Sequence, residues 1–250
     1  MRKAIFVSGR YLEEMEEIFR EEGLPIELTR LVFVESSFNV MARSKVGASG
    51  LWQIMPGTAK PYGYLREGVD KRNHPMYATR LAAKILKGAY GLLQSWPLAI
   101  TAYNHGPSGM KRLSQRYKTD DIAELIEKVN HHETFGFASK NFYASFLAAL
   151  EVEQNSPLHF KNIVWSKPFD AKPILLSSSL EFSRLLNWFG GDEYKLQVFN
   201  PHISKSLMSL NKHIPHNTEI YVPAERFTAA IVDLAFKPNR KVASESKREN

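Results

Sequence analysis

The carboxylate of Glu35 is the first candidate for chemistry in this sequence. It follows the apolar run Leu31 to Val34 and precedes two serines, at the expected end of a helix. Apolar surroundings disfavour the ionised form of a carboxyl group and raise its pKa, as a general acid at neutral pH requires. A lone glutamate at a helix end is usually an ordinary exposed residue, so the residues that follow decide the interpretation.

The stretch after Glu35 contains no acidic residue. From Ser36 to Arg66 there is no Asp or Glu, while basic residues, glycines and small polar side chains recur. This composition predicts an open cleft floor with hydrogen-bond donors around one acid. Most glycoside hydrolases place two carboxylates across the scissile bond. One acid/base is sufficient if a 2-acetamido group of the substrate attacks the anomeric carbon and a sugar 6-hydroxyl then displaces it.

Three segments carry motifs that match a known family in residue type, order and spacing. They are Glu35 to Asn39, Ser44 to Ala59 and Ala102 to Pro107. They resemble the motifs of family 1 lytic transglycosylases, which are soluble-lytic-transglycosylase-type enzymes with a goose-type lysozyme-like fold. Within that family the chain is most similar to the membrane-bound transglycosylase D branch. The resemblance covers about residues 8–155.

The resemblance implies a role for each matching residue. Glu35 would protonate the glycosidic oxygen between N-acetylmuramic acid and N-acetylglucosamine, and would then deprotonate the muramoyl 6-hydroxyl as a 1,6-anhydro ring closes. Tyr103 and Asn104 would position the acetamido group and the glutamate. The residues expected to contact the substrate are Ser44, Ser49, Gln53, Met55, Tyr103 and Asn104. The implied activity is that of a peptidoglycan lytic transglycosylase that acts without water.

One motif departs from the family pattern. The family commonly has Glu-Thr-x-Asn-Tyr-Val before the last helix of the domain, with the tyrosine reaching the active site. Here Ala138 stands at the glutamate position and Phe142 at the tyrosine position. A phenyl ring cannot donate a hydrogen bond. Tyr143 could supply a hydroxyl from the next position, although on a helix it points about 100° away.

Other cofactor chemistry finds little support. The chain has no cysteine, which excludes disulfides, thiolate zinc sites and a cysteine nucleophile. His105, His131 and His132 lack metal-ligand spacing, and no phosphate-binding glycine loop is present. We therefore expect neither a metal nor a cofactor. Trp52 and Trp96 are expected to pack in the protein or to stack on sugar.

Apolar spacing predicts an all-α domain over residues 8–155. Prolines at first-turn positions and glycines after helix ends punctuate it. The expected helices are 10–22, 26–35, a short one from Pro56, 75–90, 97–103, 120–129 and 139–154. The predicted fold class is thus mainly α, with a lysozyme-like (goose-type) catalytic domain followed by a small α+β subdomain.

The remainder of the chain has a different composition. Residues 156–170 are predicted to be a linker, 171–235 a strand–helix–helix–strand subdomain, and 236–250 a disordered basic tail. The expected elements are a strand at 173–176, a helix at 180–189 after Ser178, a helix to Phe199 capped by Asp192, and a strand at 218–223. This order is similar to a degenerate LysM module, which binds N-acetylglucosamine runs, although the insert 203–217 is long. A non-binding subdomain is the alternative.

The charge and the N-terminus bear on partner and location. Thirty-three Lys and Arg against 26 Asp and Glu give a net charge of +7, which favours an anionic partner such as peptidoglycan. No apolar run could span a membrane, and the first residues do not resemble a signal peptide, so a periplasmic or cell-envelope location follows from the substrate alone. We expect a monomer.

Rival functions remain. They are a hydrolytic muramidase on the same fold, a non-catalytic peptidoglycan-binding protein and, more remotely, a nucleic-acid binder, for which no recognised motif is present.

Overall fold

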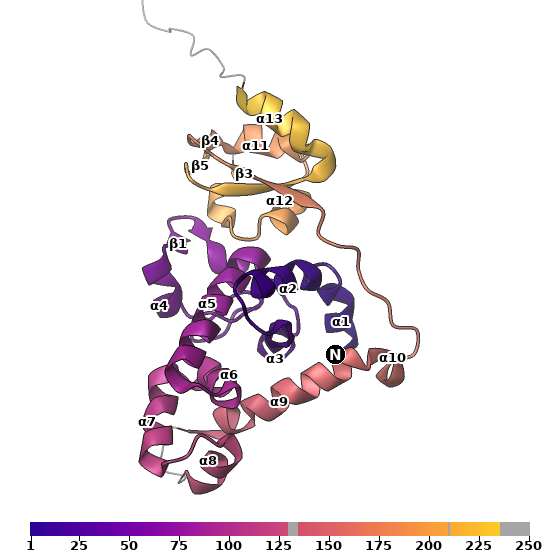
Figure 1. The fold of residues 1–250 in the computed structure, drawn as a ribbon. Coiled ribbons are helices and arrows are strands. Elements are labelled where there is room, and N and C mark those ends of the chain that lie inside the picture. Colours follow the sequence, from indigo (N-terminus) through magenta and orange to yellow (C-terminus); the bar gives the residue numbers. More distant parts are fainter. Residues whose placement is uncertain (130–134, 210, 236–250) are drawn as a thin grey trace, which may run out of the picture. The chain divides into compact units, whose positions relative to one another are not determined.

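Helices dominate the first part of the chain in the computed structural model, which describes residues 1–129, 135–209 and 211–235 (Figure 1). Contacts divide the chain into two units. The first contains Met1–Phe169 and Pro201–Ser204, and the second contains Asp170–Asn200 and the residues from Lys205 onward. This organisation confirms the predicted mainly α fold followed by a small α+β subdomain.

The α-helices of the first unit are α1 (Arg2–Ser8), α2 (Leu12–Glu21), α3 (Leu31–Glu35), α4 (Pro56–Ala59), α5 (Pro75–Leu93), α6 (Trp96–His105), α7 (Pro107–Tyr117), α8 (Ile122–Lys128), α9 (Phe137–Gln154) and α10 (Ser156–His159). Three 3-10 helices join them: η1 (Ile26–Arg30), η2 (Lys60–Tyr62) and η3 (Lys71–Asn73). Prolines occupy the first or second position of α4, α5, α6 and α7, where the missing N–H costs no helical hydrogen bond.

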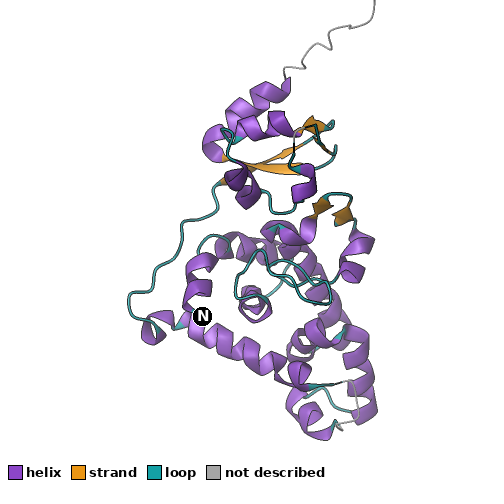
Figure 2. Ribbon diagram, turned by 180° about the vertical axis from the view of Figure 1, so that it is seen from behind, coloured by secondary structure: helices purple, strands orange, loops and turns teal. Residues whose placement is uncertain are grey.

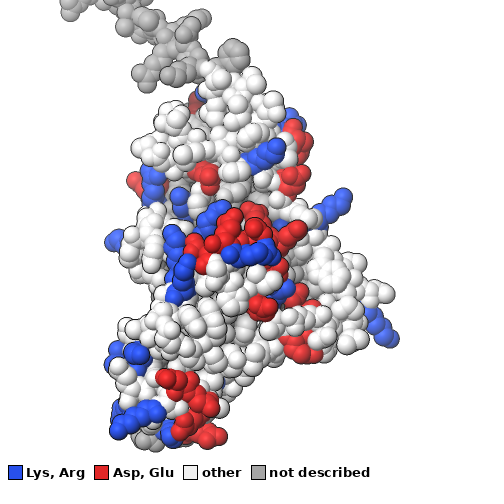
Figure 3. Space-filling view, viewed as in Figure 1, with Lys and Arg blue, Asp and Glu red and all other residues white. Residues whose placement is uncertain are grey.

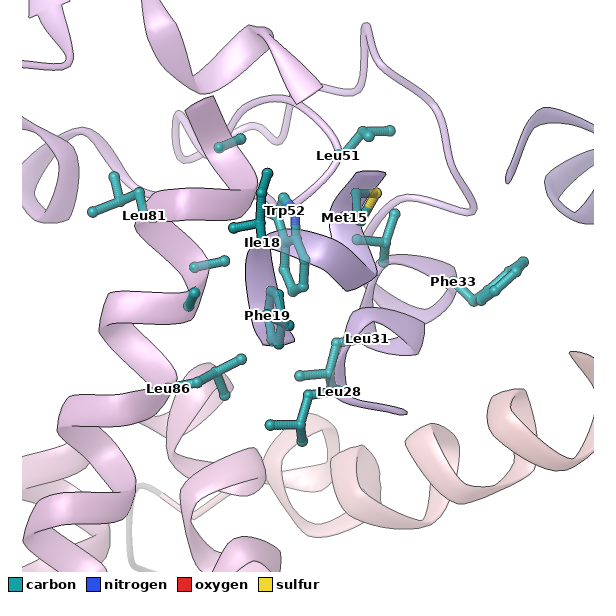
Figure 4. Close-up of a cluster of buried hydrophobic side chains, with 14 of the residues drawn as sticks. Met15, Ile18, Phe19, Leu28, Leu31, Phe33, Leu51, Trp52, Leu81 and Leu86 are labelled. Atoms are coloured by element: carbon teal, nitrogen blue, oxygen red, sulfur yellow. The ribbon is translucent and has the colours of Figure 1, made fainter. Parts of the chain in front are cut away.

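The core of the first unit surrounds Trp52. Its indole has no solvent exposure, stacks on Phe19 with 5.6 Å between ring centroids, and donates a 2.9 Å hydrogen bond from Nε1 to Thr79 Oγ1. Figure 4 shows side chains of α2, α3 and α5 converging on this ring. A second apolar cluster joins α6 to α7 and α8. The two clusters fix α3 and α6, which carry Glu35 and Tyr103.

A short hairpin interrupts the helices, contrary to the expectation of an all-α domain. Strands β1 (Leu65–Arg66) and β2 (Val69–Asp70) pair antiparallel around Gly68, whose φ is +70°. The Pro201–Ser204 segment of the same unit extends this pairing, because the Asp70 N–H donates to His202 O at 2.8 Å and Val69 bridges Ile203. Strands of two residues are too short to give a visible alternating pattern in the sequence.

The segment predicted as a linker is held on the first helix. The Ser166 N–H donates to Phe6 O at 2.8 Å, and the Phe169 N–H donates to Arg10 O at 2.9 Å. Gly9 lies between these contacts, and a Cβ there would come within 2.7 Å of Trp165 Cβ. The structure therefore places residues 156–169 and the helix α1 in the first unit, beyond the predicted bounds 8–155.

The described residues of the second unit form two small antiparallel sheets and three α-helices (Figure 2). Its elements are β3 (Ala171–Leu175), β4 (Leu180–Glu181), α11 (Phe182–Trp188), α12 (Glu193–Phe199), η4 (Lys205–Leu207), β5 (His213–Ile214), β6 (Glu219–Pro223), η5 (Ala224–Arg226) and α13 (Phe227–Ala235). Strands β3 and β6 pair with Ile174 opposite Ile220, and both side chains are buried.

The strand–helix–helix–strand order is present in this unit, with two differences from the prediction. Asp192 caps α12 as expected, by accepting from the Lys195 N–H at 2.9 Å. The predicted helix from Leu180 begins instead at Phe182, because Leu180 and Glu181 pair with β5 as a strand. Helix α13 was not predicted. The predicted disordered tail lies outside the described residues.

Candidate functional site

Glu35 is the last residue of α3, and the backbone turns sharply after it. Ser37 and Phe38 both have positive φ, 51° and 57°, which is costly for residues with a side chain. The buried ring of Phe38 packs on Phe33 with 4.6 Å between centroids, so core packing offsets that cost. This turn ends the helix at Glu35 and leaves its carboxyl group at the helix terminus.

The surroundings of Glu35 move the titration of its carboxyl group toward neutral pH. Burial raises the pKa of Glu35 from 4.5 to about 7. Helix α3 packs on α9 and η1. Burial disfavours the charged form of a carboxyl group. A group with such a pKa can give up a proton at neutral pH and take one back, as the role predicted for Glu35 requires.

Tyr103 on α6 is the neighbour that couples electrically to Glu35. Burial raises the pKa of Tyr103 well above 10, and the nearby Glu35 charge raises it further. The Tyr103 hydroxyl donates a 2.9 Å hydrogen bond to Trp52 O. Since Trp52 is fixed in the core, the phenol ring of Tyr103 is fixed too. It places an uncharged side chain near the Glu35 carboxyl group.

The loop 44–54 contains three of the predicted substrate residues, and its side chains mainly support the loop itself. Ser44 Oγ accepts from the Ala48 N–H at 2.9 Å. Gln53 Nε2 donates to Gly50 O at 2.8 Å, which leaves the amide oxygen of Gln53 outside that bond. Ser49 is 1% exposed, and its Oγ donates to Asn73 Oδ1 at 2.5 Å. As placed, Ser49 stabilises the loop and cannot touch a ligand.

Asn104 follows Tyr103 and has an exposed side chain. Its Oδ1 accepts a 2.9 Å hydrogen bond from the buried Ser139 Oγ of α9. The Asn104 carboxamide is thereby anchored to α9 through its oxygen. His105 Nδ1 lies 3.5 Å from the same Ser139 Oγ.

The remaining predicted residues differ in exposure. Met55 is 41% exposed and is available for contact with a ligand. Trp52 is fully buried and cannot stack on sugar, whereas Trp96 stacks on Tyr90 with 4.2 Å between centroids. The two tryptophans thus take the packing role of the two that the sequence allowed.

The departing motif lies on α9 as predicted. Phe142 is buried in the core that also contains Trp52. Tyr143 is half-buried and stacks on Phe146 at 6.3 Å. The phenyl ring of Phe142 therefore fills space without offering a polar group.

Sequence reasoning missed the segment that supports the loop. Arg72 is buried, and it pairs with Asp70 through Nε and Nη2 at 3.0 and 2.8 Å. Its Nη1 donates to two loop carbonyls, Gly47 O and Ile54 O, both at 2.8 Å. The Asp-x-Arg spacing soon after the acid-free stretch is the only trace of this arrangement in the sequence.

The described surface and side chains show neither a large basic patch on the face of Figure 3 nor a cluster of metal ligands. On the face seen in Figure 3, Lys and Arg are intermixed with Asp and Glu, and no large basic patch is visible there. Among the described residues, no three side chains of His, Cys, Asp or Glu lie together as a metal site would require. His131 and His132 lie outside the described residues. None of the helices in the described part of the chain has the length and apolar character of a membrane-spanning segment.

Comparison with known proteins gave one matching family and several relatives. Residues 15–126 match the family described as Transglycosylase SLT domain. The membrane-bound lytic murein transglycosylase D of Escherichia coli K12 is 26% identical over 196 residues, which are 76% of this chain and 42% of that protein. A putative tributyltin chloride resistance protein of Alteromonas sp. M-1 is 32% identical over 110 residues, 43% of this chain and 53% of that protein. The chain thus spans about half, or less, of these curated relatives.

Solved structures of lytic transglycosylases are also similar. An inactive mutant of Slt from Pseudomonas aeruginosa matches with a TM-score of 0.48 and 22% identity, over 60% of this chain and 25% of that one. The 70 kDa soluble lytic transglycosylase of Escherichia coli matches with a TM-score of 0.45 and 20% identity, over 56% and 24%.

Proposed function

We propose that this chain is a peptidoglycan lytic transglycosylase, and the match of residues 15–126 to the transglycosylase SLT domain family supports this proposal. It cleaves the β-1,4 bond between N-acetylmuramic acid and N-acetylglucosamine and releases 1,6-anhydromuropeptides. The observation that carries the proposal is a single carboxyl group, Glu35, whose pKa is raised to about 7 by burial beside the fixed Tyr103.

The proposed reaction uses Glu35 twice. Its proton passes to the glycosidic oxygen, the bond to the muramoyl C1 breaks, and the 2-acetamido oxygen of the substrate bonds to C1. The Glu35 carboxylate then takes the proton of the muramoyl 6-hydroxyl, whose oxygen attacks C1 and displaces the acetamido oxygen. Glu35 ends protonated, as it began, and no water is consumed. A pKa near the working pH suits both steps.

The other residues of the site hold the substrate. The exposed Asn104 presents N–H groups to the acetamido carbonyl, since Ser139 occupies its oxygen. Ser44, Gln53 and Met55 line the glycan, and Ser49 acts by supporting the loop. Tyr103 limits solvation of the carboxyl. No metal or cofactor takes part in these steps.

Product analysis tests the proposal. Purified sacculi are incubated with the protein, and the masses of the soluble muropeptides are measured by mass spectrometry. Anhydro products, one water lighter than hydrolytic ones, support the transglycosylase. Hydrated products alone would identify a muramidase, and release of no product would leave only a binding protein.

A matched pair of variants ties the reaction to the site. Glu35→Gln is expected to abolish release of products. Glu14→Gln removes another carboxyl whose pKa burial raises, on α2, and it is expected to retain activity. Equal activity of Glu35→Gln and the parent would refute the proposed mechanism.

The partner and location follow from the same proposal. The substrate is an anionic cell-wall polymer, so we propose that the protein acts in the periplasm or cell envelope as a monomer. The second unit is proposed to be a divergent LysM-like module, supported by its strand–helix–helix–strand order. Cosedimentation with sacculi from which stem peptides were removed would test glycan binding by the Glu35→Gln protein.

A further inference from the structure

The segment Asp70–Asn73 forms a platform against the loop 44–54. Two of its residues contact the loop. The Arg72 side chain bonds Gly47 and Ile54 and its backbone lies against Gly50, while Asn73 bonds Ser49. A Cβ on Gly50 would lie 2.0 Å from Arg72 O, so the two backbones are as close as glycine permits.

We infer that Arg72, with Asp70 as its counter-ion, is a positioning residue for the proposed transglycosylase reaction, because its guanidinium joins Gly47 and Ile54 and so holds the glycan-contacting loop in its working shape. This inference rests on the proposed function. Arg72 touches no reacting atom, and it acts through Ser44 and Gln53, which the loop presents.

The loop requires such support because its own conformation is unfavourable. Three of its residues have positive φ: Gly47 at 92°, Gly50 at 77° and Gln53 at 45°. Gln53 carries a side chain, so its backbone is strained unless the surroundings impose it. The loop also lies within the acid-free stretch and contains no carboxylate that could pair with Arg72. The counter-ion of the guanidinium is Asp70, which lies outside the loop.

Arginine is the side chain that fits this task. Its planar fork binds both Asp70 oxygens, and one nitrogen remains for the carbonyls at 2.8 Å. A lysine could not keep all these bonds. Asp70 also cancels the charge, so the clamp brings no net charge toward Glu35 and leaves the pKa of that group to burial.

The kinetic consequence is specific. Glu35 lies on α3 and Tyr103 on α6. The one loop residue that Tyr103 bonds, Trp52, is held in the core by Phe19 and Thr79 and not by Arg72. Loosening the loop should weaken substrate binding and leave the proton transfer intact. We expect Arg72→Lys to raise KM for soluble glycan fragments by about tenfold, with kcat within about twofold of the parent and the pH midpoint unchanged.

Arg30→Met is the matched control. Arg30 is a partly buried, ion-paired arginine of the first unit, and its partners Glu16 and Glu153 lie on α2 and α9, away from the loop 44–54. This variant should lower Tm and leave hydrogen exchange of the Gly50 N–H unchanged. Asp70→Asn is the milder variant of the pair, and it keeps the clamp testable if Arg72→Lys does not fold. It should raise KM less than Arg72→Lys does.

Hydrogen exchange provides a readout that does not depend on activity. The Gly50 N–H, bonded to Ala42 O at 2.9 Å, should exchange at least about tenfold faster in Arg72→Lys, while amides of α5 stay protected. Unchanged exchange in the loop, or a fall in kcat with KM unaltered, would overturn the inference. A parent without transglycosylase activity would refute the proposed function, and loop exchange would then still test the clamp.

Discussion

Replacing Glu35 by glutamine should stabilise the protein in a manner that depends on pH. The folded state holds the Glu35 carboxyl in a site that burial makes hostile to charge, and its pKa rises there from 4.5 to about 7. The unfolded chain has no such site. In the folded state the group is therefore either protonated or carries a buried charge, and both cost free energy above its ordinary pKa. A glutamine side chain does not ionise and has no such cost.

The sign and size follow from proton linkage. Below pH 4.5 both states carry the proton, so Glu35 contributes no difference. Between 4.5 and about 7 the folded state binds more protons than the unfolded state, so stability falls as pH rises. Each pH unit corresponds to about 1.4 kcal/mol, so the loss levels off at about 3 kcal/mol above neutral pH.

The assay compares free energies of unfolding for the parent and Glu35→Gln at about pH 4 and about pH 8. Unfolding in urea is followed by the hydrogen exchange of α5 amides. Because α5 belongs to the first unit, this readout reports on the unfolding of that unit alone. The advantage of the variant should grow by about 3 kcal/mol between the two pH values. Any offset from the amide itself is the same at both and cancels. An advantage that does not change with pH would refute the raised pKa.

Three further substitutions address the site. Gly50→Ala should lower the free energy of unfolding in urea by about 3 kcal/mol or more, because an alanine disfavours the positive φ of this position and its Cβ would clash with Arg72 O. A loss below about 1 kcal/mol would contradict this reasoning. Tyr103→Phe leaves a buried carbonyl without its donor and should cost about 1–2 kcal/mol, as thermal unfolding would reveal. Ser139→Ala releases the Asn104 amide and should lower kcat/KM severalfold, with recovery in Ser139→Thr; equal loss in both would argue against orientation of the amide.

The helix bounds were predictable where a proline in the first turn or a glycine after the last turn marks them. Pro56, Pro75 and Pro97 stand in the first turns of α4, α5 and α6, as expected from their fixed φ. Gly23 ends α2 with a φ of +70°. By contrast, α7 was missed although Pro107 begins it, because its sequence is mostly polar and buries only a narrow stripe around Met110 and Leu113.

The candidate site was predictable at residues that act through their own chemistry. A carboxyl group in apolar surroundings is visible in the sequence, and Glu35 has the expected raised pKa. The positions of Ser49 and Trp52 were not predictable, since burial of both depends on contacts with Asn73, Thr79 and Phe19, which are distant in sequence. Arg72 was missed for the same reason.

The attachment of residues 160–169 to α1 sets an order of events during synthesis. The N-terminal segment leaves the ribosome more than 150 residues before the backbone groups that it will bond. Phe6 O of α1 accepts from Ser166, and Arg10 O, just after α1, accepts from Phe169. Until residues 160–169 emerge, they cannot cover the nascent N-terminal segment, and Gly9 faces solvent. A fragment that stops at residue 155 would hold α1 in that immature condition permanently, so the shortest stably folded catalytic fragment should extend to at least Phe169.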